Sequence, residues 1–278
     1  MKFTKMQGIG NDYIYINCFT EQVPDPSGLS VLLSDRHFGV GGDGIILIGP
    51  SEKADFTMDI YNADGSRALM CGNGIRCVGK YVYDHGMTEK THLTIETLSG
   101  IRDLDLTVEN GQVSLVRVDM GEPVFEPDRI PVVLDEKKER ILSHPVEVLG
   151  KMYRMTCVSM GNPHAVVCVE DPNLFQIEKK GPVFENLSCF PDRVNTEFIR
   201  VLDRNNVLMR VWERGSGETM ACGTGACAVV AACVANGWTD REVTVHLRGG
   251  DLGITWNETD NRIYMTGPAV TVFEGELQ

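Results

Sequence analysis

The sequence predicts a mixed α/β (α+β) fold of two pseudo-symmetric domains, each a mostly antiparallel sheet wrapped around a central helix. Alternating polar and apolar residues, as in THLTIETLSG and DLGITWNETDNRIYMTG, are typical of antiparallel strands. Two stretches, MCGNGIRCVGKYVYDHG at 70–86 and MACGTGACAVVAACVANG at 220–237, instead have a cysteine and two glycines opening a run typical of a buried helix. Each half of the chain therefore holds one such helix among strands, and we expect the active site in the cleft between the halves.

The chain also repeats itself at a fixed distance. At an offset of 222 − 71 = 151 residues, Gly10 and Asn11 fall on Gly161 and Asn162, and Cys71 falls on Cys222. Matches that keep the same order indicate two equivalent halves. We therefore place one domain at 1–119 together with 266–278, and the other at 120–265. The final strand is expected to cross back to the first domain because GPAVTVFEGELQ resembles GEPVFEP.

Each half has the same predicted order of elements. Strands are expected at Tyr13–Phe19 and His164–Val169, and a strand running into a glycine turn is expected in FTMDIYNADGS and in VLMRVWERGSGE. Turns are predicted at 109–111 and 257–260. The proline-rich segment GEPVFEPDRIPVVLDEKKER is expected to be an exposed connection, and EDPNLFQIEKKGPVFEN is expected to be irregular.

The composition is that of a globular protein. Of 278 residues 42% are hydrophobic and 23% charged, which suits a chain with a sizeable core. The net charge of −13 offers no basic footprint for nucleic acid, and no apolar run approaches a membrane span. MKFTKMQGIGNDYIYI lacks the pattern of a secretory signal, so a cytoplasmic location is expected, with the nine cysteines as thiols.

Cys71 and Cys222 are the candidate catalytic residues. A core cysteine does not need glycines at the first and third following positions, whereas a thiol that meets a ligand needs bare backbone beside it. A helix N-terminus also stabilises negative charge and lowers the pKa of a thiol. The alternative, a small buried hydrophobic residue, is our interpretation of the others that we considered: Cys77, Cys157, Cys168, Cys189, Cys227 and Cys233.

Other interpretations of these motifs remain open at this point. Four thiolates in two pairs suggest zinc, but neither spacing is that of a zinc knuckle, and no metal is expected. Two close thiols can form a redox pair, although C-x-x-C is absent. Asn11 and Asn162 can simply cap turns. His164 is either a satisfied polar group or a group that sets the pKa of a thiol, and Glu213 with Arg214 can be a surface ion pair.

The motifs YNADGSRALMCGNGIRC, SMGNPHAV, RVNTEF and ERGSGETMACGTGAC closely resemble those of the diaminopimelate epimerases. The resemblance covers nearly the full length, and the two CGxG blocks together are highly specific. Members of this family interconvert LL- and meso-2,6-diaminopimelate without a cofactor, in the biosynthesis of lysine and of peptidoglycan precursors. The resemblance implies two similar α/β domains with the active site between them, a small-molecule substrate and a homodimer.

The resemblance also implies roles for individual residues. Cys71 and Cys222 match the two acid/base cysteines, and His164 with Glu213 match groups that tune the thiols. The other matching positions contact substrate. At the reacting carboxylate these are Gly72, Asn73, Gly223 and Thr224; at the distal amino acid they are Asn62, Asn195, Glu213 and Arg214; Asn11 and Asn162 line the cleft. Gly44 departs from relatives that carry a substrate-contacting glutamine, so only backbone is offered there.

Two acid/base groups suit this chemistry because inversion takes a proton from one face of the α-carbon and returns one to the other. Another two-thiol racemase, acting on proline, hydroxyproline or histidine, is the first alternative. Asn62, Asn195 and Arg214 argue against it, since a substrate without a second amino acid end does not need them. A non-catalytic binding module or thiol redox protein is the alternative from a different class.

Overall fold

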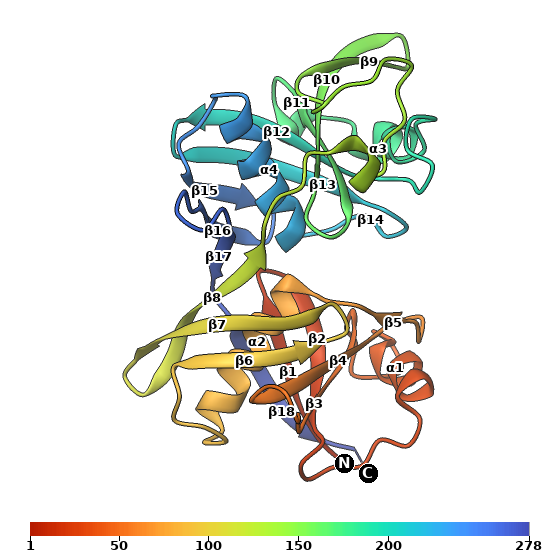
Figure 1. Ribbon diagram of the computed structural model, residues 1–278. Coiled ribbons are helices and arrows are strands. Elements are labelled where there is room, and N and C mark those ends of the chain that lie inside the picture. The colour runs from red at the N-terminus through yellow and green to blue at the C-terminus, as the bar shows by residue number, and fades with distance from the viewer. Residues whose placement is uncertain (278) are drawn as a thin grey trace. The chain divides into compact units, whose positions relative to one another are not determined.

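The computed structural model describes residues 1–277, so Gln278, the last residue of the first expected domain, lies outside the described part. The chain divides into two compact units, unit 1 at Met1–Asp119 with Thr266–Gln278 and unit 2 at Met120–Met265. The fold is mixed α/β and consists mostly of sheet, as the sequence predicts (Figure 1).

Unit 1 is a sheet that holds one long helix. The strands and helices of this unit are β1 (Lys2–Gly8), β2 (Asn11–Asn17), α1 (Pro26–Ser34), β3 (Gly44–Gly49), β4 (Phe56–Asn62), β5 (Arg67–Ala68), α2 (Gly72–Asp84), β6 (His92–Thr97), β7 (Gly100–Glu109), β8 (Gln112–Gly121) and β18 (Val270–Glu276). β8 runs just past the end of the unit's first segment, and β18 pairs antiparallel with β1. Helix α2 packs against β1, β2 and β7. Nearly all of α2 is buried, so it forms the centre of this unit.

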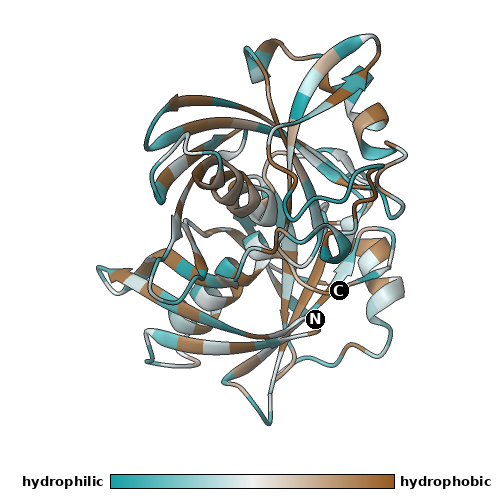
Figure 2. Ribbon diagram, turned by 45° about the horizontal axis from the view of Figure 1, so that its top comes forward, coloured by the Kyte–Doolittle hydropathy of each residue, from teal (hydrophilic) through white to brown (hydrophobic). Residues whose placement is uncertain are grey.

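Unit 2 repeats the arrangement with additional short elements. Its elements are η1 (Pro127–Arg129), β9 (His144–Val148), β10 (Lys151–Ser159), β11 (Pro163–Cys168), η2 (Pro172–Leu174), α3 (Ile177–Glu185), β12 (Asn195–Asp203), β13 (Asn206–Glu213), β14 (Gly217–Glu218), α4 (Gly223–Ala235), β15 (Glu242–Leu247), β16 (Gly250–Trp256) and β17 (Ile263–Gly267). α4 packs against β10, β11, β12, β15 and β16. A helix that is apolar on all sides must be buried, and Figure 2 shows α4 brown along most of its length.

The two units pair their strands in the same order. In unit 1, β1–β2 is antiparallel, β2–β3 parallel, β3–β4 antiparallel and β4–β6 parallel. In unit 2, β10–β11 is antiparallel, β11–β12 parallel, β12–β13 antiparallel and β13–β15 parallel. The cysteine helix follows the fourth long strand of this series in each unit. The turns before β2 and β11 carry Gly10 and Gly161 at φ 87° and 91°, values that favour glycine.

Local signals predict most element positions. The predicted strands start and end within two residues of β2 and β11, and the turn at 109–111 is confirmed by positive φ at both Asn110 and Gly111. Two other expectations are wrong. Residues 170–186 are not irregular, because they contain η2 and α3. The segment from Gly121 to Arg140 is not simply exposed, because Ile130 and Val132 join a core cluster of unit 2.

Candidate active site

Cys71 caps the N-terminus of α2. Its backbone is extended, with φ −137° and ψ 112°, and its Sγ accepts a hydrogen bond from the Gly74 amide at 3.3 Å. A helix N-terminus stabilises negative charge, so Gly72 and Asn73, which open α2, lie at a position that suits an anion. The buried Arg76 guanidinium steadies this turn by donating to the Gly72 carbonyl at 3.3 Å and to Asn73 Oδ1 at 3.0 Å.

Asn11 connects the Cys71 sulfur to a charged cluster. The Cys71 thiol donates to Asn11 Oδ1 at 3.1 Å, and Asn11 Nδ2 donates to Asp43 Oδ2 at 2.7 Å. Arg36 forms ion pairs with both Asp43 and Asp12. Burial raises the pKa of Asp43, and the neighbouring Asp12 carboxylate adds to this effect. Asn11 is thus held in a fixed orientation beside the Cys71 sulfur.

Gly44 and Asn62 are directly paired across β3 and β4. A Cβ at position 44 would lie 2.1 Å from the Tyr61 carbonyl oxygen and 2.8 Å from Cε1 of Tyr13. The structure therefore has no room for a side chain here, which agrees with the expectation that Gly44 offers only backbone. The Asn62 side chain donates to Ser66 Oγ at 3.0 Å.

Cys222 caps α4 with the same extended backbone, φ −127° and ψ 111°, but its environment differs from that of Cys71. It is 5% exposed, and its Sγ lies 3.6 Å from Thr224 Oγ1. Burial, followed by the carboxylates of Glu213 and Glu197, raises the pKa of the Cys222 thiol well above its ordinary value. The Gly225 amide in the first turn of α4 lowers this pKa, as the sequence predicts for a helix N-terminus, but burial and the two carboxylates outweigh it.

A chain of hydrogen bonds runs from Thr224 into the core of unit 2. Asn162 Nδ2 donates to Thr224 Oγ1 at 3.3 Å, and Asn162 Oδ1 lies 3.0 Å from His164 Nε2. His164 Nδ1 lies 2.7 Å from Glu197 Oε1. Because a carboxylate and an amide oxygen only accept hydrogen bonds, Nδ1 donates to Glu197 and Nε2 donates to Asn162 Oδ1. His164 is therefore a buried polar group with both ring nitrogens hydrogen-bonded, and these hydrogen bonds lead toward Cys222. Its effect on the pKa of the thiol stays a prediction.

Of the residues expected to hold the distal end of the substrate, Asn62 ends β4 in unit 1, whereas the others lie in unit 2 at the start of β12 and at the end of β13. Asn195 Oδ1 accepts from the Arg214 amide at 2.9 Å, and Asn195 Nδ2 donates to the Pro163 carbonyl at 2.9 Å. The Arg214 guanidinium donates to the Asp192 carbonyl at 2.9 Å. Arg214 is thus not in a simple ion pair with its neighbour Glu213.

Glu213 faces Cys222 instead. It accepts from the Thr219 hydroxyl, and burial raises its pKa, while hydrogen bonds from Thr219 and Cys222 oppose that rise. Sequence reasoning did not select Thr219, Asp43 or Glu197. For Glu197 a signal was present, since an acid directly before the apolar pair Phe198 and Ile199 needs a partner if the strand is buried.

The remaining cysteines differ in burial. Cys77, Cys157, Cys227 and Cys233 are buried, as expected of small core residues. Cys168 is exposed and Cys189 is only partly buried, so the expectation of buried residues is wrong for these two. Cys168 is the last residue of β11 and the first exposed one, since the five residues before it are all buried.

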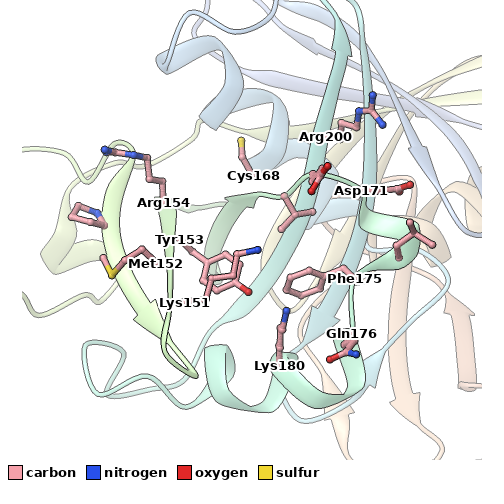
Figure 3. A pocket seen from close by; sticks show the side chains of 14 residues that line it. Lys151, Met152, Tyr153, Arg154, Cys168, Asp171, Phe175, Gln176, Lys180 and Arg200 are labelled. Atoms are coloured by element: carbon pink, nitrogen blue, oxygen red, sulfur yellow. The ribbon is translucent and has the colours of Figure 1, made fainter.

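A separate hollow of about 1130 Å³ lies on unit 2, lined by residues of β10, η2 and α3 (Figure 3). The ammonium of Lys180 lies 4.5 Å from the ring centre of Phe175 beside it. None of the predicted site residues lines this hollow. Among residues 1–277, no group of three or more His, Cys, Asp or Glu side chains is arranged to hold a metal. No helix in the same part of the chain has both the length and the apolar composition to cross a membrane.

Comparison with known proteins identifies the family. The family model of diaminopimelate epimerase matches residues 3–126 and 156–272. The chain belongs to the diaminopimelate epimerase family. It is therefore an enzyme of the epimerase type.

Curated relatives support the assignment over the whole length. The diaminopimelate epimerase of Acetivibrio thermocellus is 59% identical over 277 residues, which cover 100% of this chain and 98% of the relative. That of Methanococcus maripaludis strain S2 is 55% identical over 277 residues, covering 100% and 99%.

Solved structures show the same fold at low identity. A hydroxyproline epimerase from Agrobacterium vitis with bound trans-4-hydroxy-L-proline superposes with a TM-score of 0.70 at 16% identity, covering 100% of this chain and 90% of that one. A phenazine biosynthesis protein of the PhzF family from Bacillus anthracis gives 0.69 at 18% identity, covering 100% and 99%. These two likenesses concern the fold alone.

Proposed function

We propose that this enzyme interconverts LL- and meso-2,6-diaminopimelate by a two-cysteine acid/base reaction that needs no cofactor. Unit 1 and unit 2 would serve as the two epimerase domains. Family membership and the identity of 59% to a diaminopimelate epimerase support the substrate. The observation that carries the mechanism is that Cys71 and Cys222 each cap a buried helix, one in each unit.

The proposed reaction is balanced in protons. One sulfur, as thiolate, takes the α-proton and becomes a thiol, while the opposite thiol gives its proton to the other face of the carbanion and becomes a thiolate. A thiolate suits the first step because it is the form of the cysteine side chain that can accept a proton. The two roles exchange when the reaction runs backward. A single base would return the proton to the face from which it came.

The helix N-termini would stabilise the carbanion. Charge that develops at the α-carbon spreads into the adjacent carboxylate, which the amides of Gly72, Asn73, Gly223 and Thr224 would hold. One preorganised donor of this kind contributes about 2.7–4 kcal/mol to a transition state. Arg214, Glu213, Asn62 and Asn195 would hold the distal amino acid end, with Arg214 gripping its carboxylate through paired hydrogen bonds.

The proposed setting is that of a biosynthetic enzyme, acting in lysine and peptidoglycan precursor synthesis. We propose a cytoplasmic location because the substrate is a polar metabolite and the two reactive cysteines work as thiols. We propose a homodimer on the basis of family resemblance, and sedimentation of the purified chain tests it.

The test is α-proton exchange in D₂O with the purified enzyme and no added pyridoxal phosphate or metal. Wild-type enzyme should epimerise LL-diaminopimelate and introduce deuterium at the inverted carbon. Cys71→Ala and Cys222→Ala should each lower kcat by at least about 100-fold, the lower range for loss of an acid/base group. Cys227→Ala is the control, because Cys227 is buried in the same helix as Cys222. If either catalytic variant keeps near wild-type kcat, or if L-proline is turned over in preference, the proposal is wrong.

A further inference from the structure

The first turns of α2 and α4, which follow Cys71 and Cys222, pack against side chains of different polarity. In unit 1, a Cβ added at Gly74 would meet Ile46 Cδ1 at 2.7 Å and Met58 Cε at 3.1 Å. In unit 2, a Cβ added at Gly225 would meet Glu197 Oε1 at 2.8 Å and Met209 Cε at 3.0 Å. One helix therefore packs on two apolar groups, whereas the other packs on one apolar group and a carboxylate.

The repeat shows that these are equivalent positions. Adding the offset of 151 places Ile46 on Glu197 and Met58 on Met209, because 46 + 151 = 197 and 58 + 151 = 209. The same offset places Tyr13 on His164, because 13 + 151 = 164. Of these three equivalent pairs, one is methionine in both units. At the other two, unit 2 has an acid in place of Ile46 and a histidine in place of Tyr13.

The side chain of Glu197 is completely buried. Glu197 and its partner His164 both have side chains that are 0% exposed. Glu197 Oε2 is buried and has no hydrogen-bond partner among residues 1–277. A carboxylate in this position is costly to bury, and an apolar residue of similar size would often serve stability as well or better. Its presence at this position points to a role at the Cys222 end of the site.

The contacts define what that role can be. From Glu197, hydrogen bonds pass through His164, Asn162 and Thr224 to within 3.6 Å of Cys222 Sγ. Gly225, in the first turn of α4, leaves the space that the carboxylate occupies. Glu197 therefore fixes the His164 ring by accepting from Nδ1, and it places a carboxylate below the helix that carries Cys222.

The titratable groups that act on Cys222 come from three strands. β13 supplies Glu213, β12 supplies Glu197, and β11 supplies His164, which acts on Glu213. β15 and β16, which also pack against α4, bury only apolar side chains. β10 buries Cys157, whose pKa is raised by burial and by the nearby Cys189. The two carboxylates, with burial, raise the pKa of the Cys222 thiol.

We propose that Glu197 is a positioning residue that holds the chain ending at Cys222 and, by its charge, keeps that sulfur as the thiol, so that Cys222 starts the reaction as the proton donor. This inference rests on the proposed two-cysteine function for its catalytic meaning. The underlying electrostatic effect does not depend on turnover.

The experiment measures thiol ionisation directly. Wild type and Glu197→Gln, which keeps the shape and removes the charge, are treated with methyl methanethiosulfonate across a range of pH. Peptide mass spectrometry then gives the modification midpoint for Cys222 and Cys71 separately. We expect the Cys222 midpoint to fall by about one pH unit in Glu197→Gln, the lower end of shifts caused by a nearby charge, with the Cys71 midpoint unchanged.

Two further variants separate positioning from a structural role. Glu197→Asp keeps the charge and should leave the Cys222 midpoint near that of the wild type. Glu178→Gln makes the same charge change at an exposed position of α3 and should leave both midpoints unchanged. An unchanged Cys222 midpoint in Glu197→Gln overturns the proposal, as does an equal shift at both cysteines. If the Cys222 midpoint moves but Cys222→Ala still epimerises, the proposed function fails while the electrostatic effect of Glu197 stands.

Discussion

Replacement of Gly44 by alanine tests whether the backbone at this site tolerates a side chain. The added Cβ would lie 2.1 Å from the Tyr61 carbonyl oxygen, whereas ordinary contact begins at 3.4 Å. β3 and β4 must therefore separate by 3.4 − 2.1 = 1.3 Å at the pair formed by Gly44 and Asn62, and the obstacle is backbone that cannot rotate away. Overpacking of this kind costs about 1–3 kcal/mol.

That cost is measurable as thermal stability. At about 2–4 °C per kcal/mol, Gly44→Ala should lower Tm by about 2–12 °C. Gly49→Ala is the matched control because Gly49 lies at the other end of β3, and the nearest atom there is the side-chain hydroxyl of Thr57 at 2.9 Å. A hydroxyl can rotate, so the control should lose less than half as much. Because Asn62 is displaced, we also expect KM for diaminopimelate to rise in Gly44→Ala. If Gly44→Ala is as stable as Gly49→Ala, the steric reasoning is wrong.

Two further predictions concern charged groups. Arg214→Lys should lower kcat/KM for diaminopimelate by at least about tenfold, since a lysine cannot form the paired hydrogen bonds to a distal carboxylate, and it should change little for a substrate without that carboxylate; equal losses in steady-state assays on both substrates would place Arg214 elsewhere. Burial raises the pKa of Asp12, but hydrogen bonds from Arg36 and Lys5 outweigh this and hold it below the ordinary 3.8. A carboxylate whose pKa is lower in the folded than in the unfolded protein stabilises the fold at pH values above the unfolded pKa, and this stabilisation is lost as the pH falls through the folded pKa. The free energy of unfolding of Asp12→Asn, measured in urea, should therefore be smaller than that of the wild type at pH 7, and the difference should disappear below about pH 4. A difference that is the same at both pH values would contradict this.

Elements with local signals were predictable from the sequence. The hairpin at Asn110 and Gly111 follows from one dipeptide that favours positive φ, and the helix starts follow from the residues around Cys71 and Cys222. α3 was missed because Gly181 and Pro182 are typical helix breakers. Gly181 is instead required by packing, since a Cβ there would lie 2.4 Å from Trp212. This contact spans 31 residues, since 212 − 181 = 31, and no local pattern reveals it.

In the candidate site, too, some features follow from local sequence and others depend on contacts between residues that are distant in the sequence. The motifs select Cys222 and Asn162, but the ionisation of Cys222 depends on carboxylates from two different strands. Glu197 lies in a quoted motif, yet its importance appears only when β11 and β12 pair and place it beside His164. Identity of the reactive residue is thus a local property of the sequence, whereas its protonation state is a property of the packed interior.

The difference between the halves bears on how a two-thiol site can work at a single pH. If both thiols titrated independently with the same pKa, the form with one chosen sulfur as thiolate and the other as thiol would reach only about a quarter of the molecules. Separating the two pKa values fills the interval between them with the productive form. A duplicated domain begins with equal half-sites, so some substitution has to make them unequal. The positions of Ile46 and Glu197 provide such a difference, because the acid is present only beneath Cys222 and disfavours its thiolate. After each turnover Cys71 is the thiol and Cys222 the thiolate. The same charge then favours return of a proton from water to Cys222 while Cys71 releases its proton to water, and these two transfers restore the starting form.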